Sequence, residues 1–332
     1  MPKKYHVAVV GATGAVGVEL LRVMERRDFP VADLRLLASS RSVGKSLSFR
    51  GNDFPVAALD EDSFAGIDLA FFSAGSKTAK DFAPIARRAG AVVVDNSSAF
   101  RMDPAVPLVI PEINPDDAKQ HQGIIANPNC TTAVALMALS PLHRAFGLRR
   151  VFASSYQAVS GAGARAIDEL KQQATASASG GELVCDVFPH PIAFNVIPQI
   201  DSFLENGYTK EEMKMQEEGR KIMHLPHFAA SVTCVRVPVY RAHSVALSAE
   251  FDHAVSLTAA REALSHAAGL DLVDEPEINF YPTPLAAAGR DHCLAGRLRI
   301  DCAFENGLAL WVAGDQLLKG AALNAVQIAE LL

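Results

Sequence analysis

One cysteine stands where a helix is expected to begin. Cys130 lies in the segment NPNCTT, residues 127–132, and an apolar stretch with helical spacing follows at 133–145. Asn129 is a suitable N-cap, so the positive end of the helix dipole would favour the thiolate form of Cys130. Such a thiolate could act as a nucleophile towards a carbonyl group. The alternative is a buried cysteine that only fills space.

The other cysteines have no comparable setting. Packing is the role expected for Cys185, Cys234, Cys293 and Cys302. The five cysteines include no C-x-x-C pair, which argues against a disulfide framework and against structural zinc. We therefore expect no metal site, and a reducing compartment.

A glycine-rich turn near the start of the chain predicts a nucleotide site. The segment GATGAVG, residues 11–17, follows an apolar run at 5–10 and precedes helical spacing at 18–24. Glycines let the backbone bend sharply and approach a pyrophosphate at the positive end of the following helix. The residues expected to bind the cofactor here are Gly11, Thr13, Gly14, Ala15, Val16 and Gly17.

A second segment bears on the choice of cofactor. Roughly 20 residues after such a turn, NAD sites usually carry Asp or Glu for the ribose 2′-hydroxyl group. This chain instead has SSRS at 39–42. The hydroxyl group of Ser40 and the guanidinium of Arg41 suit a 2′-phosphate, which favours NADP(H). In the other interpretation, Arg41 is a solvated loop residue.

The elements that must position these residues begin with an α/β domain. Apolar runs at 34–38, 69–72 and 91–94 follow the first one, and helical patterns such as 78–88 separate some of them. This alternation predicts a doubly wound, Rossmann-like parallel sheet. We expect the nucleotide-binding domain to span 1–128 and to be completed by residues 316–332. Within these, 319–332 has the pattern of an amphipathic helix that returns to the first domain.

The second domain is expected at 129–315, where the apolar runs are longer than in the first domain. Longer runs at 151–159, 232–239 and 245–251 predict sizeable strands, so we expect an α+β domain with a mixed sheet. Helices are expected at 164–173 and 209–223. The low-complexity segment ATASASGG, residues 174–181, is expected to be a flexible loop.

Composition and net charge limit the class of protein and the kinds of partner that can be expected. A chain of 332 residues with 49% hydrophobic and 20% charged residues is typical of a globular protein of two domains. Lys and Arg number 31 against 37 Asp and Glu, so the net charge of −6 provides no global field for nucleic acid or an anionic membrane. No signal-like segment follows Met1, and no apolar run reaches the roughly 18 residues of a membrane helix. A cytoplasmic location is expected.

Several segments together resemble one family. They are the glycine turn at 11–17, NPNCTT at 127–132, QAVSGAG at 157–163, RVPVYRAH at 236–243 and KGAALNAVQ at 319–327. In this order, and over essentially the whole chain, they resemble bacterial aspartate-semialdehyde dehydrogenase. The resemblance implies reversible, NADPH-dependent reductive dephosphorylation of L-4-aspartyl phosphate to L-aspartate 4-semialdehyde and phosphate, on the route to lysine, methionine and threonine. Cys130 would carry a thioester that accepts a hydride.

The resemblance also implies roles for single residues. His243 matches the acid/base histidine, Gln157 the glutamine beside the thiol, and Arg236 the arginine that grips the substrate α-carboxylate. Taken alone, a histidine is more often packed or exposed, and a glutamine at a strand end is ordinary. Arg236 and His243 lie seven residues apart, so they would face opposite sides of one strand unless the chain turns between them at 240–242.

Further contacts are implied for residues in both domains. For the cofactor they are Ser160, Gly161 and Gln316, and for the substrate Arg101, Asn129, Glu211 and Lys214. Glu211 would meet the substrate ammonium, and Lys214 would share the phosphate with Arg101. Because Glu211 and Lys214 are three residues apart on a predicted helix, a solvated ion pair is the alternative.

Two departures from the family pattern and two rival functions remain open. Many relatives have Gly before the histidine and an acidic residue two after it, where this chain has Ala242 and Val245, and Gln316 stands where Asn is common. N-acetyl-glutamyl-phosphate reductase shares the glycine turn, a cysteine at a helix start and the acyl-phosphate chemistry. Its cysteine, however, typically lies in a Gly-Cys-Tyr-Pro context. A catalytically idle nucleotide-binding relative is the other alternative. The resemblance implies a homodimer, and allows a homotetramer, built through the second domain.

Overall fold

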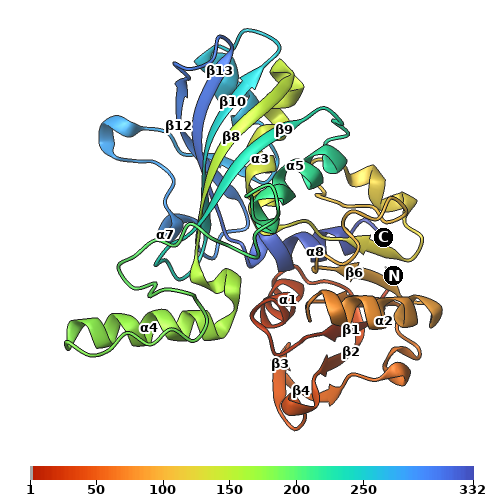
Figure 1. Cartoon of the computed structure of the whole chain (residues 1–332). Coiled ribbons are helices and arrows are strands. Elements are labelled where there is room, and N and C mark those ends of the chain that lie inside the picture. Colours follow the sequence, from red (N-terminus) through yellow and green to blue (C-terminus); the bar gives the residue numbers. More distant parts are fainter. Residues whose placement is uncertain (1–2) are drawn as a thin grey trace. The chain divides into compact units, whose positions relative to one another are not determined.

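The computed structural model describes residues 3–332, which fall into two compact units (Figure 1). Unit 1 ends at Asn129 and resumes with Ala321–Leu332, whereas unit 2 is Cys130–Gly320. The divisions lie after residues 129 and 320, whereas they were expected after 128 and 315. Within residues 3–332, no helix has the length and apolar character needed to cross a membrane.

The sheet of unit 1 is nearly all parallel. Within residues 3–332 its strands are β1 Tyr5–Val10, β2 Val31–Ala38, β3 Ser46–Phe49, β4 Asn52–Ala58, β5 Leu69–Phe72, β6 Val92–Asp95 and β7 Ile124–Ala126. They lie in the order β3-β4-β2-β1-β5-β6-β7, and only β3 and β4 pair antiparallel. The predicted doubly wound sheet is confirmed. The β3–β4 hairpin was missed because its short, mostly exposed strands carry little apolar periodicity.

The glycine turn lies where the strand order changes direction. The chain leaves β1 towards β2 on one side and continues to β5 on the other, so the turn after β1 is at the topological switch point, where such sheets bind ligands. Gly11 has φ +83°, and a Cβ there would be 2.8 Å from the Ser73 backbone after β5. The turn therefore needs glycine at this position, both for its conformation and for its close packing on β5.

Helices α1 Ala15–Arg26, α2 Ser76–Arg88 and α8 Leu323–Ala329 complete unit 1. The C-terminal helix α8 packs on α1 and β6, and its Asn324 side chain donates to the carbonyl of Val109 at 2.9 Å. The predicted return of the C-terminus to the first domain is confirmed. The helix is shorter than expected, because a π-helix, Leu318–Ala322, precedes it.

Unit 2 contains the mixed sheet that the sequence predicted. Its strands within the described chain are β8 Leu148–Gln157, β9 Ala229–Arg236, β10 His243–Phe251, β11 Leu270–Leu272, β12 Cys293–Ile300 and β13 Gly307–Gly314. The order is β11-β12-β13-β10-β8-β9, with β8 parallel to β9 and antiparallel to β10. The strands β12 and β13 were not predicted.

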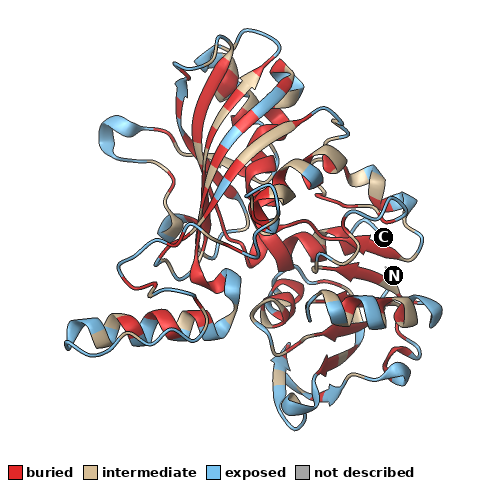
Figure 2. Cartoon of the chain, viewed as in Figure 1, coloured by how far each residue is buried: buried red, intermediate tan, exposed pale blue. Residues whose placement is uncertain are grey.

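Five helices belong to unit 2: α3 Cys130–Phe146, α4 Ala164–Ala178, α5 Lys210–Ile222, α6 Leu257–Ser265 and α7 Pro284–Ala287. The sheet contacts α3, α5 and α6, and Figure 2 shows α3 buried along most of its length. Short 3-10 helices in the described chain are Ser40–Ser42, Glu61–Phe64, Pro115–Gln120, Val159–Ala162 and Pro276–Ile278.

Some expectations were wrong. The segment 174–181 is not simply a loop, because α4 continues to Ala178. Its alanines favour this extension, since alanine is the best helix former. The packing role was wrong for Cys185 and Cys302, which are exposed, whereas Cys234 and Cys293 are buried. Strands β8 and β9 end earlier than predicted.

Candidate functional site

Three predicted residues lie together at the same end of neighbouring strands in the unit 2 sheet. Gln157 ends β8 and Arg236 ends β9, and the two are paired in the parallel register. His243 begins β10, whose next residue, Ser244, pairs with Tyr156 of β8. The alternation along each strand places all three on the buried face. The predicted turn before His243 is confirmed, since β9 ends at Arg236 and β10 begins only at His243.

Cys130 is the first residue of α3 and is partly exposed, as expected of a nucleophile at a helix N-terminus. Burial lowers the pKa of the Arg236 guanidinium, and the nearby charges of Glu211 and then Cys130 raise it. Conversely, a guanidinium remains charged in proteins, so Arg236 favours the thiolate of Cys130. The helix dipole acts in the same direction. The helix N-terminus and the Arg236 guanidinium thus both act on Cys130 in the direction of its thiolate.

Cys234 is the opposite case. This buried thiol lies on β9, two residues before Arg236. Burial, followed by the charge of Glu211, raises its pKa to about 12. At neutral pH it remains a thiol and is a poor nucleophile. Burial and charge therefore distinguish the two neighbouring cysteines chemically.

Gly320 packs directly against the cysteine, a contact that the sequence did not predict. A Cβ on Gly320 would lie 2.6 Å from the Cβ and 3.1 Å from the Cα of Cys130. Both atoms belong to the start of α3, so relief of the overlap requires Cys130 to move. Gly320 lies inside the motif at 319–327, but nothing in a single sequence indicates which residue it touches.

Replacing Gly320 by alanine is expected to reduce turnover about 10- to 100-fold, because displacing a reacting atom by even ~1 Å is costly. The alkylation rate of Cys130 by iodoacetamide, measured alongside turnover, reports the displacement. Gly181→Ala is the matched control, since its Cβ would only make ordinary contacts at 3.4 Å or more. Wild-type turnover and alkylation in Gly320→Ala would contradict the expectation.

His243 is fully buried, and its surroundings determine which nitrogen carries the proton. The backbone N–H of Ala158 donates to Nδ1 at 3.1 Å, so the neutral ring carries its hydrogen on Nε2. Burial, and then the charge of Arg236, hold the His243 pKa well below its ordinary value. Within residues 3–332, Nε2 has no hydrogen-bond partner. His243 is thus a neutral donor with its N–H available to a ligand.

Gly161 leaves room at this nitrogen. A Cβ on Gly161 would lie 3.2 Å from Nε2 of His243 and 2.8 Å from Nη1 of Arg236. Any side chain would press on both groups. The expected cofactor contact of Gly161 stays a prediction, and its packing on Arg236 and His243 was not foreseen.

Arg236 is anchored by one nitrogen only. Its Nη1 donates to the carbonyl of Ala158 at 2.7 Å, and its guanidinium lies over the Phe188 ring, 5.8 Å from the centroid. In the described part of the chain, Nε and Nη2 make no hydrogen bond, so this edge of the guanidinium suits the two oxygens of a carboxylate.

For Arg236→Lys we expect the Michaelis constant of the carboxylate substrate to rise about 10- to 100-fold, because an ammonium group cannot replace the two-point contact. The single-turnover rate at saturating substrate is expected to fall much less. Steady-state and single-turnover kinetics on the same variant separate the two effects. An unchanged Michaelis constant would rule out the carboxylate contact.

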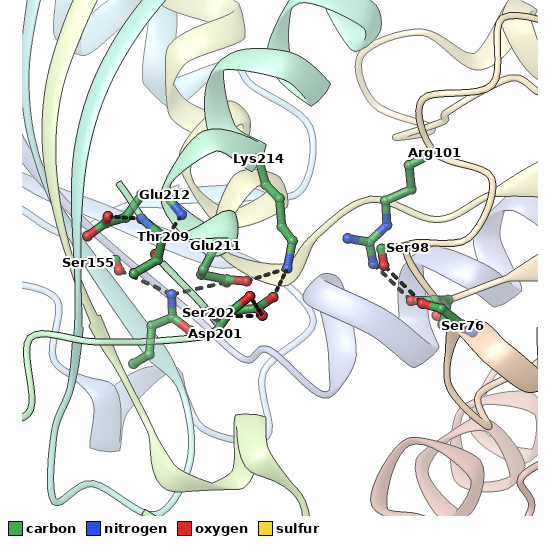
Figure 3. A network of polar contacts seen from close by, with 12 residues as sticks. Ser76, Ser98, Arg101, Ser155, Asp201, Ser202, Thr209, Glu211, Glu212 and Lys214 are labelled. Atoms are coloured by element: carbon green, nitrogen blue, oxygen red, sulfur yellow. Dashed lines mark hydrogen bonds and ion pairs between the residues drawn. The ribbon is translucent and has the colours of Figure 1, made fainter. Parts of the chain in front are cut away.

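Glu211 and Lys214 form a network with Gln157 at the start of α5 (Figure 3). Glu211 accepts from Nε2 of Gln157 at 3.3 Å and from Nζ of Lys214 at 2.6 Å, and Lys214 also lies 3.5 Å from Asp201. The side chains of Glu211 and Lys214 are only 7% and 21% exposed. The ion pair of the alternative interpretation is therefore present, but it is largely buried rather than solvated, and the substrate contacts of both residues stay predictions.

Arg101 and Asn129 belong to unit 1. Arg101 is buried and donates to the carbonyls of Asn127 and Asn96, both at 2.9 Å (Figure 3 shows its guanidinium). Asn129 is buried and directly precedes α3. Backbone carbonyls thus hold the Arg101 guanidinium in position.

The glycine turn fits a dinucleotide. Helix α1 begins after Gly14, which is exposed, and no side chain of the described residues caps its first turn. An uncapped helix N-terminus of this kind suits a phosphate group. The 3-10 helix Ser40–Ser42 is joined to the turn by Thr13 Oγ1 and Ser42 Oγ, 3.2 Å apart. Ser40 and Arg41 are exposed beside it. No group of three or more His, Cys, Asp or Glu among residues 3–332 could hold a metal.

Comparisons with known proteins agree with this geometry. Residues 6–121 match the family model described as "Semialdehyde dehydrogenase, NAD binding domain", and residues 139–319 match "Semialdehyde dehydrogenase, dimerisation domain". The aspartate-semialdehyde dehydrogenase of Aquifex aeolicus is 54% identical over 99% of this chain and 98% of its own, and that of Synechocystis sp. is 50% identical over 100% and 98%.

Solved structures give the same result. The crystal structure of aspartate semialdehyde dehydrogenase II from Vibrio cholerae superposes with a TM-score of 0.97 at 45% identity, over 99% of this chain and 98% of that one. Relatives this similar over the full length support this family over N-acetyl-glutamyl-phosphate reductase, the rival enzyme. The chain therefore belongs to the aspartate-semialdehyde dehydrogenase family.

Proposed function

We propose that this protein catalyses the reversible, NADPH-dependent conversion of L-4-aspartyl phosphate to L-aspartate 4-semialdehyde and phosphate. The observation that carries the proposal is that Arg236 and His243 lie at the same end of the unit 2 sheet, and that Cys130, at the start of α3, is close enough to Arg236 for their charges to interact. A catalytically idle relative would have no need for this combination.

The first step is acyl transfer to sulfur. The Cys130 thiolate forms a bond to the acyl carbon, the bond from that carbon to the phosphate oxygen breaks, and phosphate leaves. Arg236 would hold the α-carboxylate through Nε and Nη2, and Glu211 the ammonium. Lys214 and Arg101 would bind the phosphate. Gln157, held by Glu211, would orient the acyl group without adding charge.

The second step is reduction of the thioester. The bound nicotinamide supplies the hydride. The carbonyl oxygen of the thioester then becomes an oxyanion, for which the Nε2–H of His243 is an available donor in a buried site, where such a bond is strong. Collapse of the oxyanion expels Cys130 as a thiolate and releases the aldehyde, so the sulfur needs no proton. His243 therefore works as a donor rather than as a base towards the thiol.

The test of the reaction is phosphate-dependent formation of NADPH from L-aspartate 4-semialdehyde. We expect turnover that requires both phosphate and the aldehyde, and much lower turnover with N-acetyl-glutamate semialdehyde. Preference for the acetylated substrate would instead indicate the reductase. No turnover with either aldehyde would support the idle relative.

The exposed side chains of Ser40 and Arg41 lead us to propose NADP over NAD. Ser40 and Arg41 stand beside the glycine turn and carry a hydroxyl group and a positive charge. Arg41→Ala should raise the Michaelis constant for NADP about tenfold or more, as one charged hydrogen bond is lost, and should leave that for NAD unchanged. Equal constants for NADP and NAD in the wild type would refute the preference.

We also propose a homodimer formed through unit 2 in the cytoplasm. Residues 139–319 match a dimerisation domain. The sheet face opposite the buried site exposes Phe152, whose ring stacks on that of Phe304 with 5.7 Å between the ring centroids. Large exposed apolar side chains on a sheet face are typical of an interface. A reducing compartment keeps the sulfur of Cys130 reduced. Sedimentation equilibrium would give the mass, and a monomer or a tetramer would correct the proposed state.

A further inference from the structure

Gln316 joins two loops inside unit 2. It lies two residues beyond β13 and is buried. Its side-chain oxygen accepts from the backbone N–H of Ala242 at 2.8 Å, and its side-chain nitrogen donates to the hydroxyl oxygen of Ser160. Both polar atoms of the amide therefore have partners within the protein.

The first loop ends at Ala242, immediately before His243. Ala242 has φ +71°, a left-handed conformation that is unfavourable for a residue with a Cβ and that glycine adopts freely. The neighbouring Asp315 supports it, because its buried carboxylate accepts from Nε of Arg241 and from the backbone N–H of Gly289, both at 2.6 Å. Residues 315 and 316 thus bind the two residues that precede His243.

The second loop contains the groups that orient the imidazole. Ser160 lies in the 3-10 helix Val159–Ala162, which directly follows Ala158. The N–H of Ala158 donates to Nδ1 of His243, and its carbonyl accepts from Arg236. Gln316 therefore connects the backbone that carries His243 to the segment that binds its ring.

We infer that Gln316 is a positioning residue for His243: by holding Ala242 and Ser160 together, it keeps Nδ1 on the Ala158 N–H and thereby keeps the proton on Nε2. This role differs from the cofactor contact that the family resemblance implies, since it requires no bound ligand. The effect on turnover rests on the proposed function, whereas the effect on the ring does not.

The test is ¹⁵N NMR of the ligand-free, full-length protein labelled at histidine, with the His243→Gln spectrum used to assign the His243 signals. In the wild type we expect a neutral ring protonated on Nε2. Gln316→Leu removes both hydrogen bonds and should produce a mixture of tautomers. Ser160→Ala removes one bond and should give a smaller change, which keeps the test valid if Gln316→Leu does not fold. Gln172→Leu, an exposed glutamine on α4, is the control.

Kinetics provide the second measurement. Gln316→Leu should lower kcat about 10- to 100-fold, as expected for a misplaced catalytic group, with the Michaelis constant for NADP within about twofold of wild type. An unchanged His243 spectrum in Gln316→Leu would overturn the inference. It would also be overturned if the Michaelis constant for NADP rose by the factor by which kcat fell, because Gln316 would then act on the cofactor.

Discussion

Cys130→Ser is expected to lower turnover by about 10⁴-fold while the protein stays folded, because the nucleophile acts as part of a unit whose loss removes the covalent pathway. The serine hydroxyl group is nearly isosteric with the thiol but is not ionised near neutral pH. Neither the helix dipole nor Arg236 can convert it to a comparable nucleophile. The expected result is phosphate-dependent NADPH formation close to the uncatalysed rate.

The control is Cys234, the buried cysteine near the end of β9. Cys234→Ser changes the same atom, but Cys234 has a pKa of about 12 and is not expected to react. We expect Cys234→Ser to keep most of its turnover and Cys130→Ser to lose the acyl-enzyme that mass spectrometry detects in the wild type. Substantial turnover without Cys130 would exclude the thioester mechanism.

The second large effect concerns His243, where the identity of the replacement matters. His243→Ala is expected to lower kcat about 10²- to 10³-fold, the typical cost of removing one oxyanion donor. The amide nitrogen of glutamine can take the position of Nε2, whereas that of asparagine takes the position of Nδ1. A donor role therefore predicts that His243→Gln retains more activity than His243→Asn. A general-base role predicts that both lose activity equally.

The pH dependence follows from the low pKa of His243. The ring is neutral in the folded protein well below the ordinary pKa of 6.5, so its protonation should not reduce kcat between about pH 8 and pH 6.5. In the unfolded chain the same ring binds a proton as the pH falls below 6.5. The unfolded state then binds more protons, and the free energy of unfolding decreases by about 1.4 kcal/mol per pH unit from this group.

Denaturant unfolding of wild type and His243→Gln at several pH values measures this contribution. Because glutamine does not titrate, the difference in free energy of unfolding between the two proteins should be constant above the ordinary histidine pKa. Below it, the difference should shift in favour of the variant. A difference independent of pH would mean that His243 titrates normally in the folded protein.

Local sequence was sufficient for features that neighbouring residues create. The run at 5–10 followed by three spaced glycines predicted β1, the turn and α1, because strand, turn and helix signals there are contiguous. Cys130 was placed at a helix start for the same reason. The alternation of apolar runs and helical patterns predicted the parallel sheet, since parallel neighbours require crossover connections.

Only the tertiary structure decided how the site is assembled. Ala158 and His243 are 85 residues apart, and their hydrogen bond, which places the proton on Nε2, depends on β8 and β10 being neighbours. The contact between Gly320 and Cys130 likewise joins the two ends of unit 2. Family resemblance named Gln157, Arg236 and His243 but not their partners. Periodicity along one chain records which face a side chain occupies, whereas strand order and register determine what it meets there.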